Sequence, residues 1–346
     1  MTRSNVTSYD IAQAAGVSQS AVSRAFTPGS PIAEETRRRI LEVAAELGYQ
    51  PNALARGMST ARRGAGPRSG MAGLIVTRLQ DPFFATLVQL FSHALQRRGL
   101  HVLLFNVETE GEVGGALGRL MEYRIDGAII LSALLGGRIA EACHNIGLPV
   151  VLFNRAPADP AIGSVRIRNE EGGRVAGELL CETGHQRIAF LAGADDDDTS
   201  EMRERGLCAG LVACGRELMR REAGDYTFES GYEAGRRLLA RAERPDAVFC
   251  ASDVMALGVM QAARRDHGLC IPADLSVMGF DDIPQATWPD HALTTIRQPV
   301  ARMVRAAVTN LLARIEDPEA APSRMEFDGE LIIRRSVQLA PSARAG

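Results

Sequence analysis

The chain has 346 residues, 46% of them hydrophobic, and its formal net charge is −3. This length and apolar content allow two or three domains with large packed cores, which excludes wholesale disorder. No apolar run is long enough to span a bilayer, and the N-terminal MTRSNVTSYD lacks the apolar centre of a secretory signal peptide. A cytoplasmic protein is therefore expected.

The charge is unevenly distributed along the chain. Residues 1–63 hold eight Arg and five acidic residues, a net of +3, whereas the rest carries −6. A basic N-terminal region on an acidic body suggests contact with nucleic acid. The six cysteines form no C-x-x-C pair, which indicates reduced side chains rather than a disulfide or zinc framework. No metal or cofactor is expected.

The N-terminal region predicts three short helices. Thr7 followed by Asp10 has the spacing of a capping box, so a helix should begin near residue 8. Gly16 should end that helix, because glycine readily adopts the left-handed turn. Ser18 can cap a second helix that runs to about Phe26. A third is expected over about 33–47, with the inner stripe Ile40, Val43, Ala44 and Leu47.

The second helix should turn a polar surface outward. Its apolar side, Val22 with Ala25 and Phe26, can pack inward and leaves outside Gln19, Ser20, Ser23 and Arg24. Two helices joined by a glycine turn and braced by a third describe a helix-turn-helix. In a major groove, Gln can pair with adenine, Arg with guanine or phosphate, and Ser with either base or phosphate. A small helical bundle with a solvated polar face is the alternative interpretation.

Three stretches resemble the DNA-binding head and hinge of the LacI-type (lactose repressor) transcription factors. They are 7-TSYDIAQAAGVSQSAVSRAF-26, 35-ETRRRILEVAAELGY-49 and 48-GYQPNALARGMSTARR-63. The resemblance implies a helix-turn-helix domain over 1–49 and a hinge helix with linker over 50–70. In the family, an apolar hinge residue, usually Leu, wedges into the minor groove and kinks the DNA; Met58 stands there in this chain. The implied DNA-binding residues are Thr7, Ser18, Gln19, Ser20, Ser23, Arg24, Asn52 and Met58.

Beyond residue 70, strand-length apolar runs alternate with helical patterns. The runs are 72-AGLIV-76, 101-HVLLF-105, 127-GAIIL-131, 149-PVVLF-153, 187-RIAFL-191, 246-DAVFC-250 and 275-LSVMGF-280. This alternation predicts parallel sheets covered by helices on both faces. About 270 residues exceed one ordinary open sheet, so two lobes are expected, with ligands bound where loops at the carboxyl ends of the strands meet.

The body also resembles the periplasmic-binding-protein-like core of the LacI family. The matching stretches are 81-DPFFATL-87, 124-RIDGAII-130, 184-GHQRIAFLAG-193, 250-CASDVMALG-258, 275-LSVMGFDD-282 and 293-LTTIRQP-299. The implied fold class is a small all-α helix-turn-helix head plus an α/β two-lobed core with parallel sheets. Lobe 1 is expected over 71–184 with 297–326, and lobe 2 over 185–296 with 327–340. Crossovers should lie near Gly184-His185, near Ile296-Gln298 and at about 326.

The resemblance also implies an effector site between the lobes. Phe83 and Phe84 would stack on a ring or line an apolar wall, and Tyr226 would close the far side. Arg203 would donate hydrogen bonds to a ligand hydroxyl or carboxylate, and Asp281 would accept hydrogen bonds from the ligand. The further polar candidates are Glu171, Thr199, Ser252 and Gln298.

Three further features lie close to the expected effector site in the sequence, and each is interpreted separately. Asp253 is expected to cap its helix rather than contact a ligand. Arg168 stands where the family often has Asp, and its charge hints at an anionic effector such as a sugar acid or phosphorylated sugar. The acidic run 195-DDDD-198 could attract a hard cation, although such runs are usually solvated.

The sequence therefore predicts a dimeric, sequence-specific repressor without enzymatic activity. A dimer would place two heads on a near-palindromic operator, and a sugar or sugar acid between the lobes would switch its affinity for DNA. A purine-type corepressor is the alternative within the same class. A solute-binding protein for transport would need export and has no use for residues 1–63. A sugar-processing enzyme would need a nucleophile with its base, which the sequence does not supply.

Overall fold

The computed structural model describes residues 6–26, 29–49, 68–107, 109–131, 136–194 and 198–339. Its chain divides into two compact units, Met1–Met71 with Tyr123–Asp126, and Ala72–Glu122 with Gly127–Gly346. The helices of the first unit are called the head below, and the second unit is called the core. Within the described residues, no helix has both the length and the apolar character that crossing a membrane requires.

The head consists of α1 (Ser8–Ala15), α2 (Gln19–Ala25) and α3 (Glu34–Glu46). The predicted capping box is confirmed: Thr7 N donates to Asp10 Oδ2 at 2.8 Å, and Asp10 N donates to Thr7 Oγ1 at 3.4 Å. Gly16 ends α1 in the left-handed conformation, with φ 62°. Ser18 caps α2 by accepting from Ala21 N at 3.3 Å.

The three head helices enclose a small apolar core, which fixes the orientation of α2. Its buried residues are Ile11, Ala12, Ala15, Val22, Ala25, Ile40 and Ala44. Phe26 packs against this core and meets the Tyr49 ring edge-on, with the centroids 5.8 Å apart. The prediction for Leu47 is wrong: this side chain follows the last turn of α3 and is 44% exposed.

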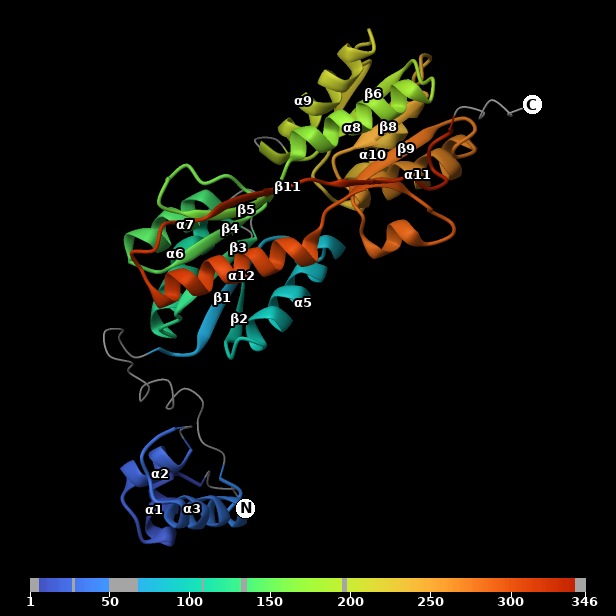
Figure 1. Cartoon of the computed structure of the whole chain (residues 1–346). Coiled ribbons are helices and arrows are strands. Elements are labelled where there is room, and N and C mark those ends of the chain that lie inside the picture. The colour runs from blue at the N-terminus through green and yellow to red at the C-terminus, as the bar shows by residue number, and fades with distance from the viewer. Residues whose placement is uncertain are drawn as a thin grey trace, which may run out of the picture. The chain divides into compact units, whose positions relative to one another are not determined.

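The core contains two six-stranded sheets, labelled in Figure 1. The first has the order β11-β5-β4-β3-β1-β2. Its strands are β1 (Met71–Val76), β2 (His101–Asn106), β3 (Gly127–Leu131), β4 (Val150–Phe153), β5 (Gly163–Ile167) and β11 (Arg324–Phe327). The pairings from β11 through β5, β4 and β3 to β1 are parallel. The carboxyl ends of these strands therefore lie at one edge of the sheet.

Helices cover both faces of the first sheet (Figure 1). On one face, α12 (Val300–Glu316) contacts β3, β4 and β5 and packs against α5 (Pro82–Gln96). On the other face lie α6 (Glu110–Glu122) and α7 (Gly136–Asn145). This double cover explains why β1, β3 and β4 are buried along their whole length.

The second sheet has the order β12-β10-β9-β8-β6-β7. Its strands are β6 (Ile188–Ala192), β7 (Arg220–Ala223), β8 (Ala247–Cys250), β9 (Ser276–Asp281), β10 (Thr294–Arg297) and β12 (Glu330–Ile332). All its pairings are parallel except that of β10 with β12. Its helices form two close pairs, α8 (Asn169–Glu182) with α9 (Asp198–Ala213), and α10 (Phe228–Leu239) with α11 (Asp253–His267).

The chain crosses between the sheets at three places. It leaves the first sheet after Ile167, returns after Arg297 and crosses again between Phe327 and Glu330. These segments lie close together, because a Cβ on Gly329 would stand 2.5 Å from Ile296 Cγ2 and 3.8 Å from Ile167 Cδ1. Two crossovers thus lie within a few residues of their predicted positions.

The first crossover differs from the prediction near Gly184-His185. Helix α8 already packs against α9 of the second lobe, so the chain changes lobe before α8 rather than after it. Hydrophobic periodicity identifies such a helix but does not reveal which sheet it covers.

The seven strand-length runs in the sequence coincide with β1, β2, β3, β4, β6, β8 and β9. The pattern missed β5, β7, β10, β11 and β12. Of these, β5 and β10 are short interior strands whose sequences, GSVRI and TTIR, contain polar residues. The other three are edge strands of their sheets, among them β7 and β11 with the sequences RREA and RMEF. An edge strand needs no continuous apolar run, because charged side chains there hinder pairing with another chain.

Candidate DNA-binding surface and ligand cavity

Helix α2 presents the four side chains that the sequence assigns to DNA readout. Gln19, Ser20, Ser23 and Arg24 are exposed, whereas Val22 and Ala25 on the opposite side are buried in the head. The outward placement of this polar surface is therefore confirmed. Its contact with DNA stays a prediction.

The side chains of this surface are already oriented by local hydrogen bonds. Gln19 Nε2 donates to Ser8 Oγ at 2.8 Å, which ties α2 to the start of α1. Arg24 Nε donates to Ser20 O at 3.2 Å, and Nη2 to Ser20 Oγ at 3.3 Å. Thr7 and Ser18 use their hydroxyls as helix caps. Asn52 and Met58 lie outside the described residues, so the hinge wedge also remains a prediction.

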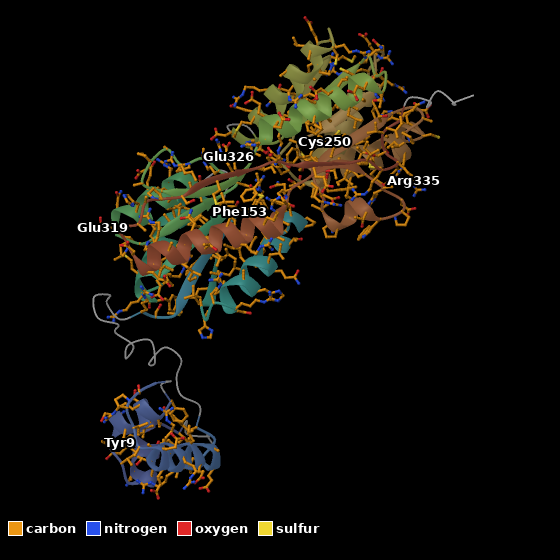
Figure 2. The ribbon with its side chains drawn as sticks, viewed as in Figure 1. Tyr9, Phe153, Cys250, Glu319, Glu326 and Arg335 are labelled. Atoms are coloured by element: carbon orange, nitrogen blue, oxygen red, sulfur yellow. The ribbon has the colours of Figure 1, made fainter. Side chains whose placement is uncertain are left out.

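Sequence reasoning did not single out Tyr9, whose ring is 67% exposed on α1 and is labelled in Figure 2. It follows Ser8, the partner of Gln19, so it lies near the N-terminal end of α2. The sequence feature that could have identified Tyr9 is an aromatic residue in the first turn of a capped helix. A phenol hydroxyl at such a place can contact a DNA phosphate.

A cavity of about 480 Å³, including its open mouth, lies between loops of the two lobes of the core. Seven predicted effector residues line it: Phe83, Phe84, Thr199, Arg203, Tyr226, Asp281 and Gln298. Six lining residues were not predicted: Arg78, Asp81, Leu87, Leu131, Phe153 and Asn154. Several of these follow strands, because the carboxyl ends of parallel strands converge at this edge. Strand position was therefore the signal that could have found them.

Arg203 on α9 is held rigidly at the cavity. Its side chain is 3% exposed, and its Nε donates to Asn169 Oδ1 at 2.9 Å. Nη1 donates to the carbonyl of Ala251, and Nη2 to Asp281 Oδ1 at 3.5 Å. The guanidinium carbon lies 3.6 Å from the centroid of the Phe280 ring. A ligand therefore meets an arginine whose position is already fixed.

A chain of hydrogen bonds crosses the cavity from one lobe to the other. Asn154, after β4, donates from Nδ2 to Gln298 Oε1 at 2.9 Å. Gln298, at the second crossover, donates from Nε2 to Asp281 Oδ1 at 2.7 Å. Asp281 ends β9 and also receives the bond from Arg203. Donors and acceptors of both lobes are thus connected at one site.

Two lining side chains carry buried polar atoms without a hydrogen-bond partner among the described residues, Arg78 Nε and Asn154 Oδ1. One is a donor and the other an acceptor. A buried polar group without a partner costs about 1–3 kcal/mol. A ligand that both accepts and donates hydrogen bonds can satisfy both.

Four lining residues adopt positive φ angles that non-glycine residues rarely populate. They are Arg78 (52°), Asn154 (59°), Tyr226 (67°) and Asp281 (114°). Each such conformation costs on the order of 1–3 kcal/mol and persists where the surroundings enforce it. Their gathering around one cavity is typical of a functional site.

Burial raises the pKa of both carboxyl groups in the lining. Burial raises the pKa of Asp281 to about 7, although the Arg203 guanidinium opposes the shift. Burial also raises the pKa of Asp81, against the hydrogen bond from Phe83 N and the charge of Arg78. Near neutral pH, the Asp281 carboxyl can therefore donate as well as accept hydrogen bonds.

Glu171 and Ser252, predicted at the effector site, do not line the cavity. Glu171 is half-exposed on α8 and pairs with Arg174. Ser252 caps α11 by accepting from Met255 N at 3.4 Å. The expected capping role of Asp253 is also wrong, since its fully buried carboxylate accepts from Thr295 Oγ1 at 2.6 Å and from Ile283 N at 2.9 Å.

Arg168 gives no support to an anionic effector. It is half-exposed, lies outside the cavity lining and pairs with Glu326 and Asp328. Glu326, labelled in Figure 2, lies on β11 near the crossover. Residues 195–197 of the acidic run lie outside the described residues, and Asp198 lies 3.6 Å from Arg155. Among the residues that the structure describes, no cluster of His, Cys, Asp and Glu could hold a metal.

Comparison with known proteins gives two family matches. Residues 7–52 match the model for bacterial regulatory proteins of the lacI family, and residues 178–337 match that for a periplasmic binding protein-like domain. The HTH-type transcriptional repressor PurR of Mannheimia succiniciproducens is 31% identical over 333 residues, which cover 95% of this chain and 98% of that protein.

Two solved structures resemble almost the whole chain. The Lac repressor dimer bound to operator and the anti-inducer ONPF has a TM-score of 0.84 at 28% identity, covering 97% of this chain and all of the other. A complex of the transcriptional regulator CelR with cellobiose has a TM-score of 0.72 at 31% identity, covering 96% and 99% of the two chains.

Proposed function

Since the chain belongs to the LacI family of bacterial regulatory proteins and is a DNA-binding transcriptional repressor, we propose that a small sugar bound in the core cavity switches its affinity for operator DNA. The observation that carries this proposal is the hydrogen-bond chain from Asn154 through Gln298 to Asp281. A sugar hydroxyl both donates and accepts, so it matches this chain and the two unpartnered atoms, Arg78 Nε and Asn154 Oδ1.

The charges around the cavity favour a neutral sugar over a sugar acid. Two guanidinium groups, Arg78 and Arg203, face two carboxyl groups, Asp81 and Asp281. The lining thus carries no excess of positive charge when both carboxyls are ionised, which for Asp281, with its pKa of about 7, requires a pH above about 7. Phe84 adds an apolar wall against which the C–H face of a sugar ring can pack. The related CelR structure, a complex with cellobiose, supports the same ligand class.

A purine is the second candidate, because four aromatic side chains line the cavity: Phe83, Phe84, Phe153 and Tyr226. The arrangement of these aromatic rings is less suited to a purine than to a sugar. The Phe83 and Phe84 rings stand nearly perpendicular, at 80°, and Arg78 already lies over the Tyr226 ring at 4.5 Å. A flat base needs an open ring face for stacking, which this arrangement restricts.

The switch acts through the relative orientation of the two lobes. Cavity residues come from both lobes, which are joined by three adjacent crossovers, so a bound ligand favours one angle between them. In a dimer, this angle would set the spacing of the two hinges and of the α2 surfaces in the major groove. Such coupling between two sites is typically about 1–3 kcal/mol and is reciprocal.

Calorimetric titration of the full-length protein tests the ligand class. Separate pools of neutral sugars, sugar acids, sugar phosphates and purines are titrated into the wild type and into Gln298→Ala. We expect binding from the neutral-sugar pool and at least a tenfold loss in Gln298→Ala. Glu171→Gln is the matched control, because Glu171 was predicted at the site but lies outside the lining. Binding from the purine pool alone would overturn the sugar assignment.

A further inference from the structure

Helices α8 and α9 lie side by side and approach each other at backbone contact (Figure 1). A Cβ on Gly173 would stand 2.1 Å from Arg203 O, and a Cβ on Gly206 would stand 1.9 Å from Glu170 O. Glycines on both helices are therefore required for this approach. With so little space between the backbones, the register of the two helices is fixed.

The two helices run parallel, and the residues that meet across them are about 34 positions apart in the chain. Asn169 meets Arg203 at the N-terminal ends, and Gly173 meets Leu207 one turn later. Another turn on, Gly177 lies against Gly210. Because residues four apart share one side of a helix, the next pair to meet should be Cys181 and Cys214.

The structure places these two cysteines as the register requires. Cys181 lies in the last turn of α8, Cys214 directly follows α9, and their side chains interact. Both are free thiols. We propose that Cys181 and Cys214 form a redox site, at which a peroxide converts the two thiols into a disulfide that joins the ends of α8 and α9.

The proposed reaction proceeds in two balanced steps. The Cys214 sulfur attacks one oxygen of hydrogen peroxide, so an S–O bond forms, the O–O bond breaks, and water leaves. The Cys181 sulfur then attacks the sulfur of this sulfenic acid. An S–S bond forms, the S–O bond breaks, and the hydroxyl leaves as water with the thiol proton. Two thiols are thereby oxidised and one peroxide is reduced to two waters.

The difference in solvent exposure between the two thiols indicates which of them reacts first. Cys214 is exposed and can meet the oxidant, whereas Cys181 is buried against it. Burial, and then the neighbouring Cys214, raise the pKa of Cys181 to about 11, while the charge of Arg216 lowers it. Arg216 Nη1 is buried without an acceptor among the described residues, so it can stabilise negative charge that develops on the attacking Cys181 sulfur.

Three other cysteines of the core are poorly placed for this reaction. Cys143 and Cys250 are buried, and burial raises the pKa of both thiols. Cys208 lies on α9 two residues from both Gly206 and Gly210, so it projects away from α8. The Cys181–Cys214 pair also lies about 18 Å along the helices from Asn169 and Arg203, so crosslinking should leave the cavity intact.

Peptide mapping of the full-length protein tests the proposal. Trypsin releases Cys181 in peptide 175–187, and releases Cys208 and Cys214 together in peptide 206–216. After treatment with hydrogen peroxide, we expect these two peptides to be linked, with a mass two hydrogens below their sum, and to separate on reduction. Because the second peptide holds two cysteines, Cys214→Ser and Cys208→Ser are compared. The link should vanish in Cys214→Ser and persist in Cys208→Ser.

Thermal unfolding gives a second readout. Oxidation should raise Tm by a few degrees in the wild type and in Cys208→Ser, and leave Tm unchanged in Cys214→Ser. Two results would overturn the proposal. One is a link that depends on Cys208 instead, and the other is oxidation of Cys214 to the sulfinic acid without any linked peptide. Neither result depends on the identity of the effector.

Discussion

The guanidinium of Arg78 lies over the ring of Tyr226, with its carbon 4.5 Å from the ring centroid. Arg78 follows β1 of the first lobe, and Tyr226 follows β7 of the second. Arg78 Nη1 also donates to the carbonyl of Asp225 at 3.4 Å. Both residues adopt positive φ angles, so the backbone is constrained on each side of this contact. The pair therefore joins the two lobes directly at the cavity.

Replacing Arg78 with alanine should weaken effector binding by about tenfold. The variant loses a cation–π contact and a hydrogen bond between the lobes, each worth on the order of 1 kcal/mol. Calorimetric titration with the ligand identified for the wild type measures the loss. Arg155→Ala is the control, because Arg155 pairs with Asp198 but does not line the cavity. Equal affinities of Arg78→Ala and the wild type would contradict a role for Arg78 at the site.

Replacing Arg24 with alanine should reduce operator affinity by about 10- to 100-fold, because a base or phosphate contact of this kind contributes about 1–3 kcal/mol. The head fold and effector binding should be unchanged, since Arg24 is exposed. Arg38→Ala is the matched control: Arg38 is a highly exposed arginine of α3 that pairs with Glu42. Fluorescence anisotropy with operator DNA at fixed salt measures both. Similar small losses in the two variants would argue against α2 as the reading helix.

Asp281 should make the stability of the ligand-free protein depend on pH. Its pKa is about 7 in the folded protein, raised by burial from an ordinary value of 3.8. The folded state thus holds this proton more tightly than the unfolded state, and stability should fall as the pH rises from about 4 through 7. In Asp281→Asn, the fall in unfolding free energy between pH 5 and pH 8 should be smaller, by on the order of 1–3 kcal/mol.

Urea denaturation at the two pH values measures this difference. The buried Asp253 remains in both proteins, and burial and then the Asp281 charge raise its pKa. Removing that charge lowers the pKa of Asp253, so its contribution changes in the same direction as that of Asp281 and forms part of the expected difference. An identical fall in the wild type and Asp281→Asn would show that Asp281 does not titrate in this range.

Replacing Gly206 with alanine should destabilise the core. A Cβ at this position would stand 1.9 Å from Glu170 O, so α8 and α9 would have to separate, at a cost of about 1–3 kcal/mol. Gly118→Ala on α6 is the matched control, because a Cβ there meets no atom within 4 Å. The control should be neutral or stabilising by about 0.5–1 kcal/mol, since alanine favours a helix. Denaturation midpoints that fall equally in both variants would contradict the tight contact.

The sequence by itself determined the local structure of the head and most of the central strands of the core. The spacing of Thr7 and Asp10, the turn at Gly16 and the cap at Ser18 act over a few residues, so they can be recognised without the fold. The central strands are recognisable because they are buried on both faces and therefore continuously apolar. Edge strands such as β7 and β11 carry no such pattern.

The tertiary structure alone decided which polar residues meet at the cavity. Glu171 and Ser252 resemble Gln298 as polar candidates in the sequence, yet one is a surface partner of Arg174 and the other a helix cap. Arg78 and Asn154 lie in short loops without a distinctive local pattern, and the convergence of strand ends brings them together. The match of Cys181 with Cys214 likewise depends on the register of α8 on α9, which glycine contacts between the two helices set. Such contacts join residues far apart in the chain, so they cannot be recognised from the spacing of neighbouring residues in the sequence.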